Sequence, residues 1–250
     1  MPRTSRRLRP VALTVAVFVL FILGTSTALA LRREEPAPRP RERPDRSATP
    51  PRATAAPHRS ASYPAAGPGT WRYAAASGPV YGGSGPVRRY RVAVESNIPI
   101  DVATFAATVD SVLGDPRGWT AGGRYRLQQV PADAAAEFTV YLATRQTSTT
   151  MCLAGGLHTD GYTSCRTPGH VVVNLDRWLG AAPGYPVDIY REYVINHETG
   201  HQLGHSHELC PGTGRPAPVM EQQTLGLHGC TANPWPYLGG ERYTGPPGQY

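Results

Sequence analysis

The spacing of apolar residues predicts several short strands from residue 89 onward. In residues 89–95, Tyr90, Val92 and Val94 occupy every second position, so their side chains lie on one face of an extended chain. Three later stretches have the same extended character, and Gly and Pro residues separate them. The predicted strands are residues 89–95, 125–130, 137–143 and 170–175.

Two stretches have helical spacing instead. Apolar side chains in residues 101–113 recur every three or four positions, and Asp101 is placed to cap such a helix. A second helix is predicted for residues 186–203, with Pro186 in its first turn, where the missing amide proton does no harm. The Gly- and Thr-rich residues 151–166 are predicted to form a hairpin or loop. The order of strand, helix, several strands and helix predicts an α+β domain.

Residues 1–31 are predicted to be a targeting element. Several arginines precede an apolar run at residues 11–31, which has roughly the 20 residues that a bilayer core requires. We expect an uncleaved transmembrane anchor with its Arg-rich end in the cytoplasm. The alternative is a secretory signal peptide, with Ala28-Leu29-Ala30 as the cleavage site. Both interpretations place the following domain outside the cytoplasm, either membrane-anchored or secreted.

Residues 32–69 are too rich in Pro, Arg, Ala and Ser to bury a core, and they are predicted to be a disordered spacer. Residues 70–250 remain for one domain. The formal net charge of +7 does not belong to this domain, because residues 1–60 hold 12 of the 25 basic residues and only four of the 18 acidic ones. A nucleic-acid-binding domain would carry the basic residues itself. We therefore expect no nucleic-acid partner.

The four cysteines agree with export, because disulfides persist in oxidising compartments. Each of two pairs brackets a Gly-rich region without a core of its own, so we expect Cys152 to bond Cys165 and Cys210 to bond Cys230. The competing interpretation is a structural zinc site that uses Cys210. It lacks the Cys-x-x-Cys spacing of such sites.

The second predicted helix carries the motif His197-Glu198-Thr199-Gly200-His201. Residues four apart on a helix lie one turn above each other, so His197 and His201 can offer two imidazole nitrogens to one metal ion. Glu198 is then placed to reach a water molecule on that ion rather than the ion itself. From the composition of the chain, this motif with the Gly and His that follow it would arise by chance in on the order of one chain in thirty thousand.

A third ligand is expected just after the helix. Gly204 can adopt the positive φ that ends a helix and turns the chain sharply, and His207 then returns to the ion. His205 is the alternative ligand, but it has little chain after Gly204 with which to turn back. Three protein ligands and one open position are typical of catalytic zinc. The competing interpretations of the cluster are adventitious metal binding and a polar patch. Three other histidines are expected to be structural or surface residues: His158, His170 and His228.

The motif His-Glu-x-x-His-x-x-Gly-x-x-His at residues 197–207 is similar to that of the metzincin metallopeptidases. Met220 follows His207 by 13 residues and resembles the Met-turn of that clan, although by itself it would be a core residue. The resemblance covers residues 89–220. The chain also resembles an actinobacterial family of exported, zincin-like domains of unknown function. Some metzincins place a Tyr two residues after the Met, where this chain has Gln222, so the oxyanion-stabilising residue stays unassigned.

The resemblance implies a zincin-like mixed twisted sheet with two main helices and a small irregular C-terminal subdomain. It also implies a Zn²⁺ cofactor and a metallopeptidase activity. Zinc would lower the pKa of a bound water toward 7, and Glu198 would accept its proton as general base and pass it to the leaving amine. We expect a monomer that acts on a peptide or protein substrate, with the cell wall as one source of substrate.

Two other functions share these residues. In a non-catalytic exported domain, the histidines would bind zinc to stabilise the fold or to bind a partner, and a protein group would close the fourth zinc position. An amidase that acts on peptidoglycan crosslinks would use the same metal chemistry and differ only in its substrate.

Overall fold

The computed structural model describes residues 63–250. The predicted targeting element at residues 1–31 and most of the predicted spacer at residues 32–69 lie outside the described residues. Within residues 63–250, no helix combines the length and the apolar character needed to cross a membrane.

Residues 63–250 contain eight strands and four helices, joined by loops. In chain order they are β1 (Trp71–Tyr73), β2 (Val87–Glu95), α1 (Val102–Gly114), β3 (Arg126–Gln129), β4 (Phe138–Ala143), α2 (Arg145–Ala154), β5 (Cys165–Thr167), β6 (His170–Asn174), α3 (Leu175–Gly180), α4 (Val187–Gln202), β7 (Tyr237–Leu238) and β8 (Glu241–Arg242).

Six of the strands form one mixed sheet in the order β1-β2-β4-β6-β5, with β3 paired to β2. β2 is parallel to β3 and β4, and β4 is parallel to β6, whereas β1 and β5 run antiparallel to their neighbours. β7 and β8 form a separate hairpin. The predicted α+β class is confirmed. The four predicted strands correspond to β2, β3, β4 and β6, and the two predicted helices correspond to α1 and α4.

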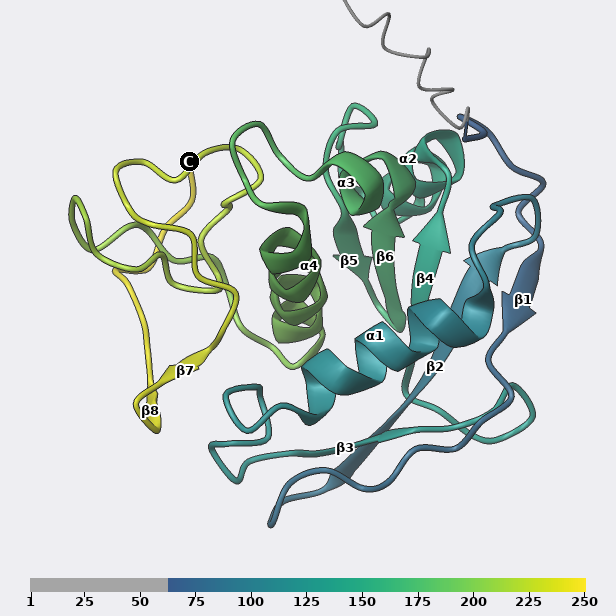
Figure 1. Ribbon diagram of the computed structural model, residues 1–250, viewed down its shortest axis with the longest axis horizontal. Coiled ribbons are helices and arrows are strands. Elements are labelled where there is room, and N and C mark those ends of the chain that lie inside the picture. Colours follow the sequence, from purple (N-terminus) through teal and green to yellow (C-terminus); the bar gives the residue numbers. More distant parts are fainter. Residues whose placement is uncertain (1–62) are drawn as a thin grey trace, which may run out of the picture. The chain divides into compact units, whose positions relative to one another are not determined.

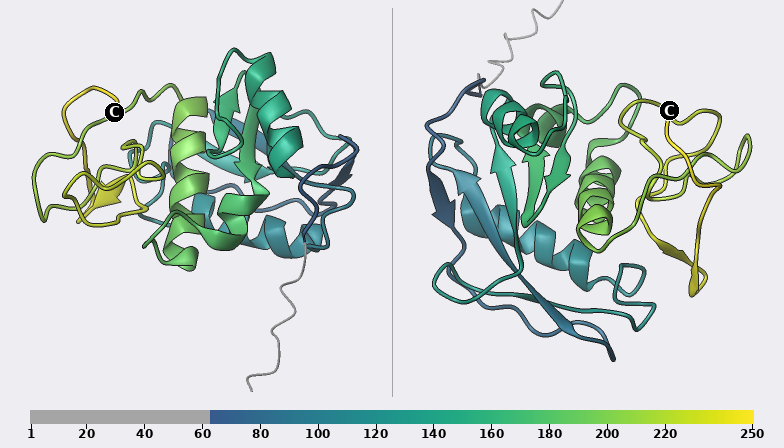
Figure 2. Two further views of the ribbon diagram at one scale, coloured as in Figure 1. Left: turned by 90° about the horizontal axis from the view of Figure 1, so that it is seen from above. Right: turned by 180° about the vertical axis from the view of Figure 1, so that it is seen from behind.

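The helices cover both faces of the sheet. Val171 and Val173 of β6 belong to the main core together with side chains of α1, α3 and α4, whereas Val172 packs with Cys152 of α2. Successive side chains of a strand point to opposite faces, so β6 is buried on both. Figures 1 and 2 show α4 on the β5 side of the sheet, with the long loops that follow it on its far side. This arrangement puts α4 between the sheet and those loops.

The prediction of a hairpin or loop over residues 151–166 is wrong for residues 151–154, because these residues form the last turn of α2. The Thr144 side chain caps this helix, and Ser148 and Cys152, four residues apart, form its buried face. One of these two side chains is polar, so the helix leaves little apolar periodicity in the sequence. The short α3 was also missed, and the prediction of two main helices therefore becomes four helices.

The folded domain begins before the predicted boundary at residue 70. The buried carboxylate of Glu95, at the end of β2, accepts hydrogen bonds from the amides of Gly69 and Thr144, both at 2.9 Å. Further upstream, the carbonyl of Ala65 accepts a hydrogen bond from the amide of Gln146 at 3.0 Å. The last residues of the predicted spacer thus belong to the domain, because Glu95 of β2 and the amide of Gln146 in α2 bind their backbone.

Both predicted disulfides are present. Cys152–Cys165 ties α2 to β5, and Cys210–Cys230 closes a loop after α4. Disulfides are characteristic of oxidising compartments, so they indicate an extracytoplasmic domain.

Candidate metal centre

Helix α4 positions the histidine motif. Tyr190 and Tyr193 bury its first half in the core, and Asp188 lies in the first turn, where a negative charge is favourable. The helix ends at Gln202, and Gly204 then adopts a φ of 93°, which side-chain-bearing residues rarely adopt. The predicted sharp turn after α4 is therefore present.

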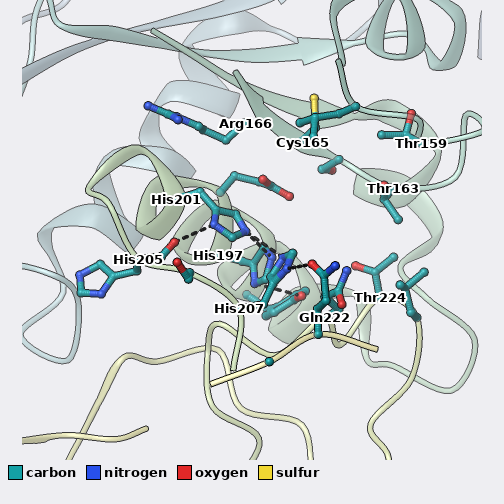
Figure 3. A pocket seen from close by; sticks show the side chains of 18 of the residues that line it. Thr159, Thr163, Cys165, Arg166, His197, His201, His205, His207, Gln222 and Thr224 are labelled. Carbon is teal, nitrogen blue, oxygen red and sulfur yellow. Dashed lines mark hydrogen bonds between the residues drawn. The ribbon is translucent and has the colours of Figure 1, made fainter. Parts of the chain in front are cut away.

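This turn brings His207 to the two helical histidines. The Nε2 atom of His201 lies 3.2 Å from Nε2 of His197 and 3.0 Å from Nε2 of His207. Zinc–imidazole bonds of about 2.05 Å in a tetrahedral site place the ligand nitrogens about 3.3 Å apart. The three side chains, drawn in Figure 3, thus have the spacing of three ligands of one zinc ion.

The contacts of the Nδ1 atoms of His197 and His201 determine the tautomers of these two imidazoles. Nδ1 of His197 lies 2.8 Å from the carbonyl oxygen of Val219, and Nδ1 of His201 lies 2.8 Å from that of His205. A carbonyl can only accept, so both Nδ1 atoms carry the proton and both Nε2 atoms present lone pairs. Lone pairs that face each other at 3.2 Å repel unless a cation lies between them. The residues therefore fit a metal ion.

The electrostatic environment keeps these imidazoles neutral. Burial lowers the pKa of His197 well below its ordinary value and that of His201 to about 4, and neighbouring histidines add to both shifts. Burial also lowers the pKa of His207. Glu198 is buried too, and burial raises the pKa of its carboxyl to about 8. Neutral imidazole is the form that binds a metal.

His205, the alternative ligand, lies outside the cluster. Its ring stacks on Trp119, with ring centroids 4.3 Å apart, while its carbonyl orients His201. Two of the isolated histidines, His170 and His228, are exposed and lie away from the cleft, whereas the exposed His158 contributes to the cleft wall.

Met220 lies directly beneath α4, the helix that carries His197 and His201. It is fully buried, and a Cβ atom added to Gly200 would lie 2.5 Å from its Sδ and 2.5 Å from Cζ2 of Trp119. The helix can approach both side chains only because Gly200 has no side chain. Val219, just before Met220, supplies the carbonyl that orients His197.

A cleft with a volume of about 780 Å³ opens over the three histidines, and Glu198 contributes to its lining. β5 and the loop before it form one wall. The loop after Met220 and the C-terminal segment form the opposite wall. Figure 3 shows the labelled wall residues around the histidines: Thr159, Thr163, Cys165, Arg166, Gln222 and Thr224.

The structure adds residues that the sequence did not indicate. The Tyr193 hydroxyl lies 3.3 Å from Nδ1 of His197, and the Gln249 side-chain oxygen lies 3.3 Å from Nδ1 of His207. Tyr193 precedes His197 by four residues on one helix, so helical spacing could have identified it. Gln249 lies 42 residues from His207, and no local pattern marks such a contact.

Glu221, which follows Met220, is a buried carboxylate near the Cys210–Cys230 disulfide. The predicted alternative of a zinc site using Cys210 does not hold, because that sulfur is bonded to Cys230.

The sequence model of a protein family described as "Protein of unknown function (DUF3152)" matches residues 58–238. The match includes α4, the histidine motif and Met220, and it ends before the C-terminal segment that contributes Gln249 to the site. No curated protein and no solved structure matches the chain.

Proposed function

This chain belongs to the DUF3152 family, and we propose that it is an extracytoplasmic zinc-dependent hydrolase that cleaves peptide bonds. The observation that carries the proposal is the convergence of three imidazole Nε2 atoms beside Glu198 in a cleft of about 780 Å³.

His197, His201 and His207 would hold the zinc ion, and Val219, His205 and Gln249 would orient them by accepting from their Nδ1 atoms. When bound, zinc would lower the pKa of a water molecule toward 7 and polarise the carbonyl of the substrate. Among residues 63–250, the cluster contains no fourth His, Cys, Asp or Glu. This supports an enzyme over a domain whose zinc is fully enclosed by protein ligands.

Glu198 would act as the general base. It follows a ligand directly in α4 and contributes to the lining of the cleft. Its carboxylate would accept the proton of the attacking water, hold it, and donate it to the leaving amine. Burial favours the first of these transfers, because it raises the pKa of the Glu198 carboxyl to about 8 and so stabilises the protonated form.

The resemblance to the metzincin peptidases supports the choice of a peptide bond. The motif at residues 197–207, the turn at Gly204 and Met220 beneath α4 are the features that the chain shares with that clan.

The test compares the full-length chain with Glu198→Gln and His201→Ala. Zinc content and hydrolysis of a mixed peptide library and of crosslinked cell-wall peptides are measured side by side. Glu198→Gln should keep one zinc per chain and lose activity by about 100-fold or more, whereas His201→Ala should lose both. His170→Ala removes an exposed histidine outside the cluster and should change neither. Full activity of Glu198→Gln, or a wild type without zinc, would overturn the proposal.

A further inference from the structure

The cleft is electrically asymmetric. Apart from the histidines, the described residues that line it include one cation, Arg166, and one acidic residue, Glu198. Figure 3 shows Arg166 on the same side of the histidine cluster as His205, with Thr163 and Thr224 on the opposite side. Along the length of the cleft, the one cation of the lining therefore lies on the His205 side, and residues with neutral hydroxyl groups lie on the other.

Arg166 is fixed but not neutralised. Its Nε donates to the side-chain oxygen of Gln202 at 2.8 Å, and Gln202 directly follows the proposed ligand His201. Among residues 63–250, no acidic side chain forms an ion pair with Arg166, and no hydrogen bond uses its two terminal nitrogens. A guanidinium held by Nε presents its remaining donors as a fork, which matches the two oxygens of a carboxylate.

A second arginine adds positive charge on this side. The guanidinium of Arg124 lies over the ring of Tyr125, whose hydroxyl donates to the carbonyl of Leu203 at the end of α4. Arg242 also lies on this side, because its guanidinium lies over the ring of Trp119, which stacks on His205. Arg242 is paired with Glu208, whereas Arg124 has no ion-pair partner among the described residues.

We propose that the His205 side of the cleft is an anion subsite, in which Arg166 binds a carboxylate of the substrate, with Arg124 contributing at longer range. The inference rests on the proposed hydrolase function, and it adds a substrate class: peptides with an acidic side chain or a terminal carboxylate on one side of the cleaved bond.

The size of the expected effect follows from the contact. A charge-assisted hydrogen bond between a guanidinium and a carboxylate corresponds to about a 10- to 100-fold difference in binding. Arg124 is exposed, so its effect should be smaller and should disappear at high salt.

Binding can be measured separately from catalysis. The full-length Glu198→Gln chain, with zinc added, is titrated against fluorescent Ala/Gly peptides that carry one Glu at each position in turn. Each peptide is paired with its Gln counterpart, and a further pair compares a free C-terminal carboxylate with a C-terminal amide. These two sets distinguish a side-chain carboxylate from a terminal one. The same peptides are used for kcat/KM with the chain that retains Glu198.

One of the two peptide sets should bind about 10- to 100-fold more tightly than its uncharged counterpart. Arg166→Gln should abolish this preference, and Arg166→Glu should reverse it, so that the uncharged counterpart of each pair binds more tightly. The matched control is Arg89→Gln, which makes the same charge change at an exposed arginine of β2 outside the cleft.

The two hypotheses fail in different ways. An acid preference that depends on Arg166, in a chain that cleaves nothing, would support the subsite and refute the hydrolase. Cleavage without an acid preference, or with one that Arg166→Gln leaves intact, would refute the subsite alone. Equal or absent binding of all charged and uncharged pairs would also refute the subsite.

Discussion

At the scale of single residues, Gly200 allows α4 to lie close to Met220 and Trp119. A methyl group at this position would lie 2.5 Å from Met220 and 2.5 Å from Trp119, well inside van der Waals contact. We expect Gly200→Ala to lower the free energy of unfolding by about 1–3 kcal/mol, the usual cost of overpacking, and to weaken zinc binding. Denaturant unfolding of the zinc-free chain and chelator competition measure the two effects.

The control for this substitution is Gly180→Ala in α3, where no atom lies within 4 Å of the added Cβ. It should leave stability within about 0.5 kcal/mol of the wild type. Equal stability of the two variants would show that Met220 and Trp119 do not pack against α4 as described.

Glu221 makes a separate prediction about pH. Neither oxygen of its buried carboxyl has a hydrogen-bond partner within residues 63–250, and burial raises its pKa from 4.5 to about 7. The folded chain therefore holds more protons than the unfolded chain between these two values, so this group lowers stability as pH rises from about 4.5 to about 7. The loss should reach roughly 3 kcal/mol above pH 7.

The measurement is denaturant unfolding in chelator at several pH values, for the wild type and Glu221→Gln. The difference between the two should change with pH as described, because titration of the histidines is common to both. Glu137→Gln, at an exposed ion pair with Arg88, should leave the slope as in the wild type. An unchanged slope in Glu221→Gln would refute the assignment.

The residues of the candidate site fall into two groups: those whose contacts are local in sequence, and those that contact residues far along the chain. His197, Glu198 and His201 could be predicted because helical periodicity relates them, and His207 because Gly204 permits the turn. The carbonyl of Val219 and the side chain of Gln249 could not, because they meet the histidines across 22 and 42 residues. Local patterns do not determine such contacts.

At the scale of elements, the same distinction separates α1 from α2. α1 has five apolar residues on its buried face and an Asp101 cap that accepts from Thr104, so the sequence predicts it. α2 buries Ser148 and Cys152, and its position depends on Glu95, which accepts hydrogen bonds from Thr144 and Thr147. A helix held by tertiary hydrogen bonds carries little signal in its own sequence.

The Cys152–Cys165 disulfide should therefore affect peptide binding in the cleft as well as the stability of the fold. It closes a loop of sequence separation 13 and holds the three-residue edge strand β5, which carries Arg166. Replacing both cysteines by Ala should lower the free energy of unfolding by about 3 kcal/mol. It should also weaken the binding of acidic peptides, because the wall that positions the guanidinium becomes less constrained.

The comparison is with Cys210→Ala/Cys230→Ala. This double substitution removes the disulfide that closes a loop of sequence separation 20 on the other side of α4. Both double variants should lose stability in denaturant unfolding. Only the first should lose the preference for acidic peptides in the fluorescence titration. A preference retained without Cys152–Cys165 would contradict this role for β5.

At the scale of the whole chain, the C-terminal residues 247–249 complete one wall of the cleft, although they lie far along the chain from the six-stranded sheet. The carbonyl of Pro246 accepts from the amide of Leu209, and the amide of Gly248 donates to the carbonyl of His207 at 3.2 Å. The side chain of Gln249 then approaches Nδ1 of His207. The third proposed ligand thus depends on a segment that lies outside the family match, which ends at residue 238. Zinc affinity could therefore vary with this segment while the histidine motif stays unchanged.

Gln249→Ala tests this dependence. Loss of a hydrogen-bond partner of a metal-bound histidine typically weakens metal binding by about 10- to 100-fold. Because the contact is 3.3 Å long and exposed, we expect about 10-fold, measured by zinc competition with a chelator of known affinity. Gln146→Ala, at an exposed position of α2 outside the cleft, should leave the affinity unchanged. Gln249→Glu should bind zinc at least as tightly as the wild type, because a carboxylate is the stronger acceptor for the Nδ1 proton. Unchanged zinc affinity in Gln249→Ala would mean that the turn at Gly204 alone positions His207.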